Sequence, residues 1–192
     1  WINTPRRVMK WYEEIKRCFL SNEPIVFSVG GGRWGLACNA IHFLDLAQWL
    51  TDEQLMDIDT SALNPEWIPS KRLGYFEVMG SLTARFSNGS TAILKVEDNN
   101  DPVMIRIKQG SFTWVIKEQE GVAERSDGYK VFGQLEFQSA LTSGIIKNIL
   151  SDGKCALPSF ATSALLHKPF LRDMLISWNR SANKETLLLP IT

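Results

Sequence analysis

The segment from residue 74 to residue 119 constrains the fold most, because its apolar residues recur at every second position in short runs. The pair Asn88-Gly89 between two such runs is typical of a β-hairpin. The predicted strands here are residues 75–86, 91–96, 103–107 and 112–116. Successive strands joined by tight turns pair antiparallel, since parallel neighbours need long crossover connections. This segment is therefore predicted to be an antiparallel meander.

Outside this segment the apolar residues recur at intervals of three and four, which predicts amphipathic helices. The predicted helices are residues 6–20, 36–50, 134–150 and 159–178, and further short strands are predicted at 25–29, 55–58 and 187–189. The helix at 36–50 is apolar over most of its circumference and should be largely buried. The sequence thus predicts one domain over residues 1–192, of the α+β class, with a mostly antiparallel open sheet and helices packed on one face.

The composition argues against several kinds of partner. The chain has 21 basic and 21 acidic residues, so it has no charge excess with which to bind nucleic acid or an anionic membrane. Its longest nearly uncharged stretch, residues 35–50, contains His42 and Asp45 and does not read as a membrane span. Three scattered cysteines without a C-x-x-C pair fit neither a disulfide framework nor a structural zinc site. We therefore expect no nucleic-acid or membrane partner, and a cytoplasmic protein without a leader peptide.

A glycine-rich stretch at residues 30–35 satisfies the G-x-G-x-x-G pattern of dinucleotide-binding folds. The rest of the chain lacks βαβ alternation, and Trp34 would crowd a bound pyrophosphate. The alternative interpretation is a strand-to-helix turn in which glycine permits unusual dihedral angles and close packing. We favour this alternative.

A row of polar residues lies along the apolar helix predicted at 36–50. Asn39, His42, Asp45 and Gln48 follow one another at three-residue steps, which brings neighbours within about 60° of each other around a helix. A buried polar group must be paired or must line a wet pocket. Asp45 is expected to accept a hydrogen bond from His42 and to raise its basicity. The alternative is that both residues only bridge the helix to neighbouring backbone.

Other residues suggest a ligand pocket beside this helix. Arg33 offers a donor fork for anionic groups, and Trp34 offers a face on which a sugar ring could stack. A metal site built on Cys38 and His42 would need distant ligands, and we expect none. His167, the other histidine, is either a second pocket residue or a residue at the edge of the core.

The helix sequence also resembles a known family. Residues 34–50 read Trp-Gly-Leu-Ala-Cys-Asn-Ala-Ile-His-Phe-Leu-Asp-Leu-Ala-Gln-Trp-Leu. They resemble the helix of Gfo/Idh/MocA oxidoreductases that carries a histidine, two further residues, an aspartate and then a tryptophan-leucine pair. Residues 2–7, Ile-Asn-Thr-Pro-Arg-Arg, are similar to the segment after the Glu-Lys-Pro motif that closes the Rossmann domain of those enzymes. The order of predicted elements matches the family's C-terminal domain over nearly the whole chain.

The resemblance implies a function. In the family, NAD or NADP is held by an N-terminal Rossmann domain and exchanges hydride with a sugar, a sugar nucleotide or a cyclic polyol. The C-terminal domain contacts the substrate and usually forms an oligomer through its open sheet face, so a homodimer or homotetramer is expected. Carried onto this chain, His42 is the proton-transfer residue. Arg7 falls near the arginine that approaches the nicotinamide.

Two departures from the family pattern qualify this expectation. Many members carry aspartate four residues before the histidine, where this chain has Cys38, so Asn39 is expected to orient the substrate instead. The chain also lacks the Rossmann domain and its motif lysine, so alone it should be inactive. We predict the substrate-binding C-terminal domain of an NAD(P)-dependent oxidoreductase, with His42 catalytic and Arg33, Trp34, Asn39 and Asp45 shaping the pocket.

Two other functions stay open. The domain could be a non-catalytic carbohydrate-binding or assembly module of the same fold, which the cysteine at position 38 favours. It could also be a purely structural interaction domain, which would have no pocket around His42.

Overall fold

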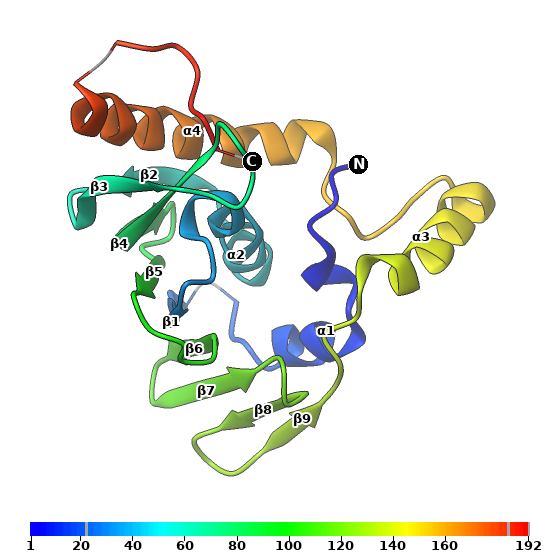
Figure 1. Ribbon diagram of the computed structural model, residues 1–192. Helices are drawn as coiled ribbons and strands as arrows, with labels where there is room; N and C mark the ends of the chain where they lie inside the picture. The colour runs from blue at the N-terminus through cyan, green and yellow to red at the C-terminus, as the bar shows by residue number, and fades with distance from the viewer. Residues whose placement is uncertain (22, 184, 192) are drawn as a thin grey trace.

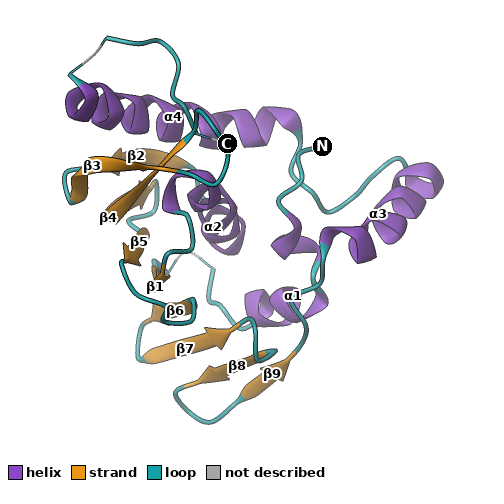
Figure 2. Cartoon of the chain, in the orientation of Figure 1, coloured by secondary structure: helices purple, strands orange, loops and turns teal. Residues whose placement is uncertain are grey.

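The structure is a computed structural model that describes residues 1–21, 23–183 and 185–191. Its helices are η1 (Pro5–Val8, a 3-10 helix), α1 (Lys10–Arg17), α2 (Leu36–Thr51), α3 (Gln138–Asp152) and α4 (Phe160–Ala182). Its strands are β1 (Val26–Gly32), β2 (Leu55–Asp59), β3 (Leu63–Pro69), β4 (Phe76–Phe86), β5 (Thr91–Glu97), β6 (Met104–Gln109), β7 (Phe112–Lys117), β8 (Val122–Arg125) and β9 (Lys130–Phe132). Figures 1 and 2 show the chain in one orientation.

The strands form one open sheet in the order β2-β4-β5-β1-β6-β7-β8-β9, with β3 paired to β4. Among the described pairs, all but β1–β5 are antiparallel. Helix α2 packs on β4 and β5, and α4 packs beside it on β2 and β3, so both helices lie on the same side of the sheet (Figure 1). Helix α3 stands away from the sheet at the right of Figure 1, and none of its residues is buried. The predicted α+β class with a mostly antiparallel open sheet is confirmed.

The predicted meander is wrong at one point, because β1 lies between β5 and β6. Strand β1 runs parallel to β5 and antiparallel to β6. The connection from β5 to β6 therefore passes over the end of β1, where the amide of Gly32 donates to the carbonyl of Asp101 at 3.0 Å. A side chain on Gly31 would place its Cβ 2.8 Å from the Cα of Val103. Gly31 and Gly32 thus permit close packing, as expected, but they lie in strand β1, and only Gly35 lies in the turn between the strand and α2.

The predicted elements are otherwise found with shifted ends. The helix expected at 6–20 is split by Met9, which is extended and almost fully buried. Strands β3, β8 and β9 were not expected, because they are short or lack clean alternation. The strand expected at 187–189 is wrong: Leu187 and Leu188 are exposed and form no ladder. No helix in the described residues combines the length and the apolar composition that crossing a membrane requires.

Helix α2 is the structural centre of the domain, as its apolar circumference predicts. Nine of its residues are buried, namely Leu36, Ala37, Ala40, Phe43, Leu44, Asp45, Leu46, Ala47 and Leu50. The helix begins after Gly35, whose φ of 75° lies in the left-handed region that glycine adopts without strain. The helix thereby holds the polar row of Asn39, His42, Asp45 and Gln48 on a rigid element inside the fold.

Candidate active site

His42 lies half-buried on α2. Its Nδ1 atom is buried and has no hydrogen-bond partner among the described residues. Burial lowers the pKa of His42 below its usual value of 6.5, and the positive charges of Arg6 and His167 lower it further. An imidazole in this environment is neutral at pH 7 and can accept a proton.

Asp45 pairs with Arg7 and not with His42. The Asp45 side chain is 2% exposed, and its Oδ1 and Oδ2 accept from Arg7 Nη2 at 2.6 Å and Arg7 Nε at 3.0 Å. Burial raises the pKa of Asp45, and the charge of Arg7 opposes that rise. The hydrogen bond expected between Asp45 and His42 is therefore wrong. The guanidinium fork is the stronger partner, because it gives a buried carboxylate two charge-assisted bonds.

This pairing also decides where Arg7 points. Its side chain is 9% exposed and is held against α2, rather than extended from η1. The exposed part lines a shallow hollow with Gln48 and Trp49. A role for Arg7 beside a nicotinamide remains a prediction.

Trp34 and Asn39 do come together, in a pocket of about 180 Å³ that we call the Trp34 pocket. It is lined by Arg6, Trp34, Asn39, Phe43, Val103, Glu118, Gln119 and Leu135. The Trp34 ring meets the Phe43 ring edge-on at 5.2 Å between centroids. The Asn39 amide donates to the Trp34 carbonyl at 2.7 Å, so the loop before α2 and the first turns of α2 hold each other in place.

Arg6 is the pocket residue that sequence reasoning missed. Its Nε and Nη2 donate to the two carboxylate oxygens of Glu118 at 2.7 and 2.9 Å. Its guanidinium carbon lies 4.1 Å from the centre of the Phe43 ring. The buried Tyr12 hydroxyl donates to the same carboxylate at 2.7 Å. Only its position next to Arg7 could have pointed to Arg6, because the partner carboxylate is 112 residues away.

Burial and the neighbouring Glu118 raise the pKa of Tyr12 well above its usual value of 10. The hydroxyl therefore stays protonated and remains a donor to the carboxylate. Arg6 and Glu118 form a charge-neutral pair at the wall of the Trp34 pocket.

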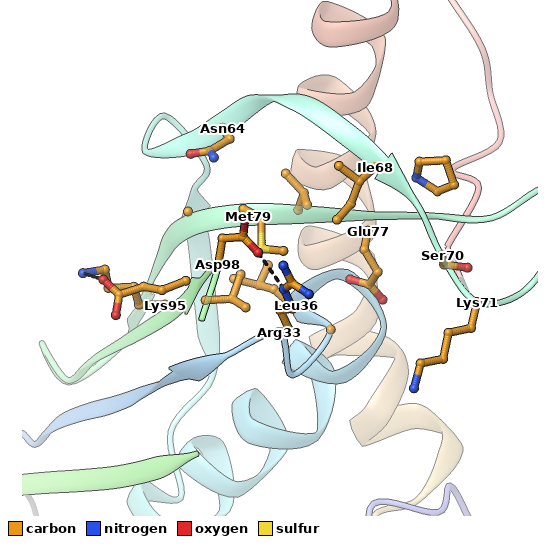
Figure 3. A pocket seen from close by; sticks show the side chains of 16 residues that line it. Arg33, Leu36, Asn64, Ile68, Ser70, Lys71, Glu77, Met79, Lys95 and Asp98 are labelled. Atoms are coloured by element: carbon orange, nitrogen blue, oxygen red, sulfur yellow. Dashed lines mark hydrogen bonds and ion pairs between the residues drawn. The ribbon is translucent and has the colours of Figure 1, made fainter. Parts of the chain in front are cut away.

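Arg33 lies elsewhere, in a larger hollow of about 770 Å³ that also includes Leu36 at the start of α2 (Figure 3). Its Nε donates to Asp98 Oδ1 at 2.6 Å, and both side chains are more than half exposed. Leu36, Lys71 and Glu77 line the same hollow. The structure thus does not bring Arg33 into the Trp34 pocket, although Arg33 directly precedes Trp34 in the chain.

The backbone amides that follow the glycine-rich fingerprint, at the start of α2, are already hydrogen-bonded to a side chain of the protein. The carboxylate of Glu77 on β4 accepts from the backbone amides of Ala37 at 2.8 Å and Cys38 at 3.3 Å (the Glu77 side chain is drawn in Figure 3). A dinucleotide-binding fold needs these amides for the pyrophosphate. The residues at this helix N-terminus therefore do not fit the phosphates of a nicotinamide cofactor.

The sequence also raised His167 and a metal site as candidates. His167 on α4 is held by Ser163, whose carbonyl lies 2.8 Å from His167 Nδ1. The described residues contain no group of three or more His, Cys, Asp or Glu side chains arranged to hold a metal ion.

Comparisons with known proteins identify the fold. A scan against models of protein families gives no match, and a search of curated proteins gives none either. Solved structures do match. UDP-N-acetylglucosamine 3-dehydrogenase from Acidithiobacillus ferrooxidans is 14% identical and superposes with a TM-score of 0.61 over 94% of this chain and 61% of its own. An oxidoreductase domain protein from Kribbella flavida is 12% identical, with a TM-score of 0.64 over 92% of this chain and 64% of its own.

Levoglucosan dehydrogenase, solved in complex with NADH and levoglucosan, is 15% identical and gives a TM-score of 0.52 over 95% of this chain and 63% of its own. The chain has the fold of these oxidoreductases. The resemblance to Gfo/Idh/MocA oxidoreductases is thereby confirmed at the level of the fold. The chain spans about three fifths of the length of these structures.

The surroundings of His42 predict its titration. In an NMR titration, the His42 ring should titrate below pH 6.5, because burial and the charge of Arg6 disfavour the imidazolium. The unfolded chain then binds a proton more readily than the folded one, so His42 lowers stability as the pH falls below about 6.5. Arg6→Gln should move the His42 midpoint upward.

Arg33→Gln is the matched control, since Arg33 lies in the other hollow, and it should leave the midpoint unchanged. The spectrum of His167→Gln assigns the two histidine signals. A His42 midpoint at or above 6.5 in the parent protein contradicts the environment described for it.

Proposed function

We propose that this chain is the C-terminal, substrate-binding half of an NAD(P)-dependent oxidoreductase that acts on a hydroxyl of a sugar, a sugar nucleotide or a cyclic polyol. The observation that carries the proposal is His42, a histidine kept neutral on α2. His42 is not itself among the residues that line the Trp34 pocket, but its neighbour Phe43 is, and so is Arg6, whose charge lowers the pKa of His42. The fold shared with sugar-related dehydrogenases supports the same function.

In this proposal His42 takes the proton from the reacting hydroxyl and returns it in the reverse reaction. A neutral imidazole can accept this proton, and the imidazolium that results can return it. Trp34 offers its ring to the apolar side of the substrate, and Asn39 orients it from the first turns of α2. Asp45 acts indirectly, through the pair with Arg7 that fixes η1 against α2. Arg33 lines the separate, larger hollow, and a substrate that fits the Trp34 pocket does not need it.

The cofactor of the proposed reaction, NAD or NADP, belongs mainly to a dinucleotide-binding domain outside this chain. Glu77 fills the one helix N-terminus that follows a glycine-rich fingerprint here. The matching structures are longer than this chain, which leaves room for such a domain. We therefore propose that the 192-residue chain alone does not catalyse, and that the whole protein is a cytoplasmic enzyme.

The second candidate function is a non-catalytic carbohydrate-binding or assembly module of the same fold. Cys38 favours it, because a thiol replaces the carboxylate that many members of the resembling family carry four residues before the histidine. The pocket itself is compatible with both functions. Substitution of His42 separates them.

In the whole protein, His42→Ala should lower kcat for a turned-over sugar by roughly two to four orders of magnitude, the usual contribution of an acid/base group. The thermal midpoint should change little, because the buried Nδ1 of His42 has no hydrogen-bond partner among the described residues for the substitution to remove. His167→Gln, at the chain's other histidine, should change kcat less than tenfold. Loss of stability without loss of kcat would favour the module.

We also propose a homodimer or homotetramer formed through the open sheet face. On that face Val26 and Ile93 are 44% and 38% exposed, on adjacent strands of the sheet. Apolar side chains clustered on an exposed sheet are typical of an interface. Sedimentation velocity at micromolar concentration should show a dimer or tetramer, and a monomer there contradicts the proposal.

A further inference from the structure

The polar groups of the Trp34 pocket match a neutral ligand. Glu118 is 7% exposed, and both of its oxygens accept bonds from Arg6 or Tyr12. Arg6 keeps its Nη1 group without a hydrogen bond among the described residues, because only Nε and Nη2 are used on Glu118. Arg6 therefore lines the pocket as a hydrogen-bond donor, and its positive charge is already neutralised by Glu118.

The other lining residues add acceptors and apolar surface to the pocket. Asn39 lines the pocket, and its amide nitrogen donates to the Trp34 carbonyl, while its amide oxygen accepts no hydrogen bond among the described residues. Gln119 is exposed and carries both a donor and an acceptor. The remaining lining is apolar or aromatic, from Trp34, Phe43, Val103 and Leu135. A lining that combines donors, acceptors and aromatic rings suits a hydroxylated ring, whose hydroxyls donate and accept and whose C–H face stacks.

An anion fits this pocket poorly. A carboxylate or phosphate that approached Arg6 would also approach Glu118, a like charge at hydrogen-bond distance from the same guanidinium. Displacing Glu118 would leave a buried carboxylate and the buried Tyr12 hydroxyl unpaired, which is costly. The Arg6–Glu118 pair therefore selects against negative charge.

The pocket is also small. Its 180 Å³ is below the roughly 300–1,000 Å³ of pockets that enclose drug-sized ligands. A single ring fills it, and a nucleoside diphosphate attached to that ring would lie outside the pocket.

We propose that the Trp34 pocket binds a single neutral sugar or cyclic polyol ring, and that Arg6, held in place by Glu118, is the residue that sets this specificity. This inference rests on the proposed function and narrows its substrate class. Arg6 contacts the ring, and Glu118 acts through Arg6 as a positioning residue.

The test compares three probes on the whole protein by saturation-transfer NMR and by equilibrium titration: glucose, glucuronate and UDP-glucose. Glucose and glucuronate differ only by the oxidation of C6 to a carboxylate. The parent protein should bind glucose at least tenfold more tightly than glucuronate, and UDP-glucose should gain nothing over glucose. Tighter binding of glucuronate or UDP-glucose, or no binding of glucose at millimolar concentration, overturns the proposal.

Two variants test the residues. Glu118→Gln keeps the shape and the acceptor for Tyr12 but leaves the charge of Arg6 unneutralised, so the preference for glucose over glucuronate should shrink tenfold or invert. Arg6→Lys keeps the charge but removes the fork, and affinity for glucose should fall about tenfold, the worth of one good hydrogen bond. Asp98→Asn, which removes the carboxylate partner of Arg33 in the other hollow, is the matched control and should change neither value.

The outcome is separable from that of the proposed function, because binding needs no turnover. Ring binding that follows Arg6 and Glu118, combined with an unchanged kcat in His42→Ala, would retain the pocket assignment and reject the acid/base role. Sugar turnover that depends on His42, combined with an unchanged preference in Glu118→Gln, would reject the pocket assignment alone.

Discussion

The buried ion pair between Arg7 and Asp45 is the interaction on which the site depends. It ties the short N-terminal helix η1 to the middle of α2, the most buried helix of the domain. A pair at this depth is held tightly, because removing one partner leaves an uncompensated buried charge at a cost of about 3–5 kcal/mol. The neighbouring Arg6 is then directed at Glu118, on the turn after β7. Two consecutive arginines thus join the N-terminal segment to a helix and to the sheet.

The same pair determines the chemistry available to His42. Since Asp45 is committed to Arg7, no carboxylate compensates the imidazole, and burial together with the charge of Arg6 lowers its pKa. Glu77 has a comparable effect at the start of α2, where it takes the amides that a phosphate would otherwise use. Internal carboxylates therefore decide what this helix can bind. Helix α2 consequently carries a neutral histidine and borders a small pocket without net charge. The amides of Ala37 and Cys38 at its start are already bonded to Glu77 and are not available to a phosphate.

Local patterns predicted much of the fold. The apolar circumference of residues 36–50 identified α2, and Asn88-Gly89 identified the β4–β5 hairpin, because both signals are contained in a few adjacent residues. The insertion of β1 between β5 and β6 could not be predicted in this way, since strand pairing is long-range. The site shows the same division. Trp34 and Asn39 lie close in sequence and were predicted together, whereas the pairing of Arg6 with Glu118 spans 112 residues and left no local signal.

A double-mutant cycle on Arg7 and Asp45 measures how strongly this buried pair holds η1 to α2. Chemical unfolding of Arg7→Gln, Asp45→Asn and the double variant gives the coupling free energy between the two side chains. Each single substitution should cost about 3–5 kcal/mol of unfolding free energy, and the double substitution should cost no more than the worse single one. Additive effects, or single losses below about 1 kcal/mol as at an exposed ion pair, would contradict the tight coupling of Arg7 and Asp45.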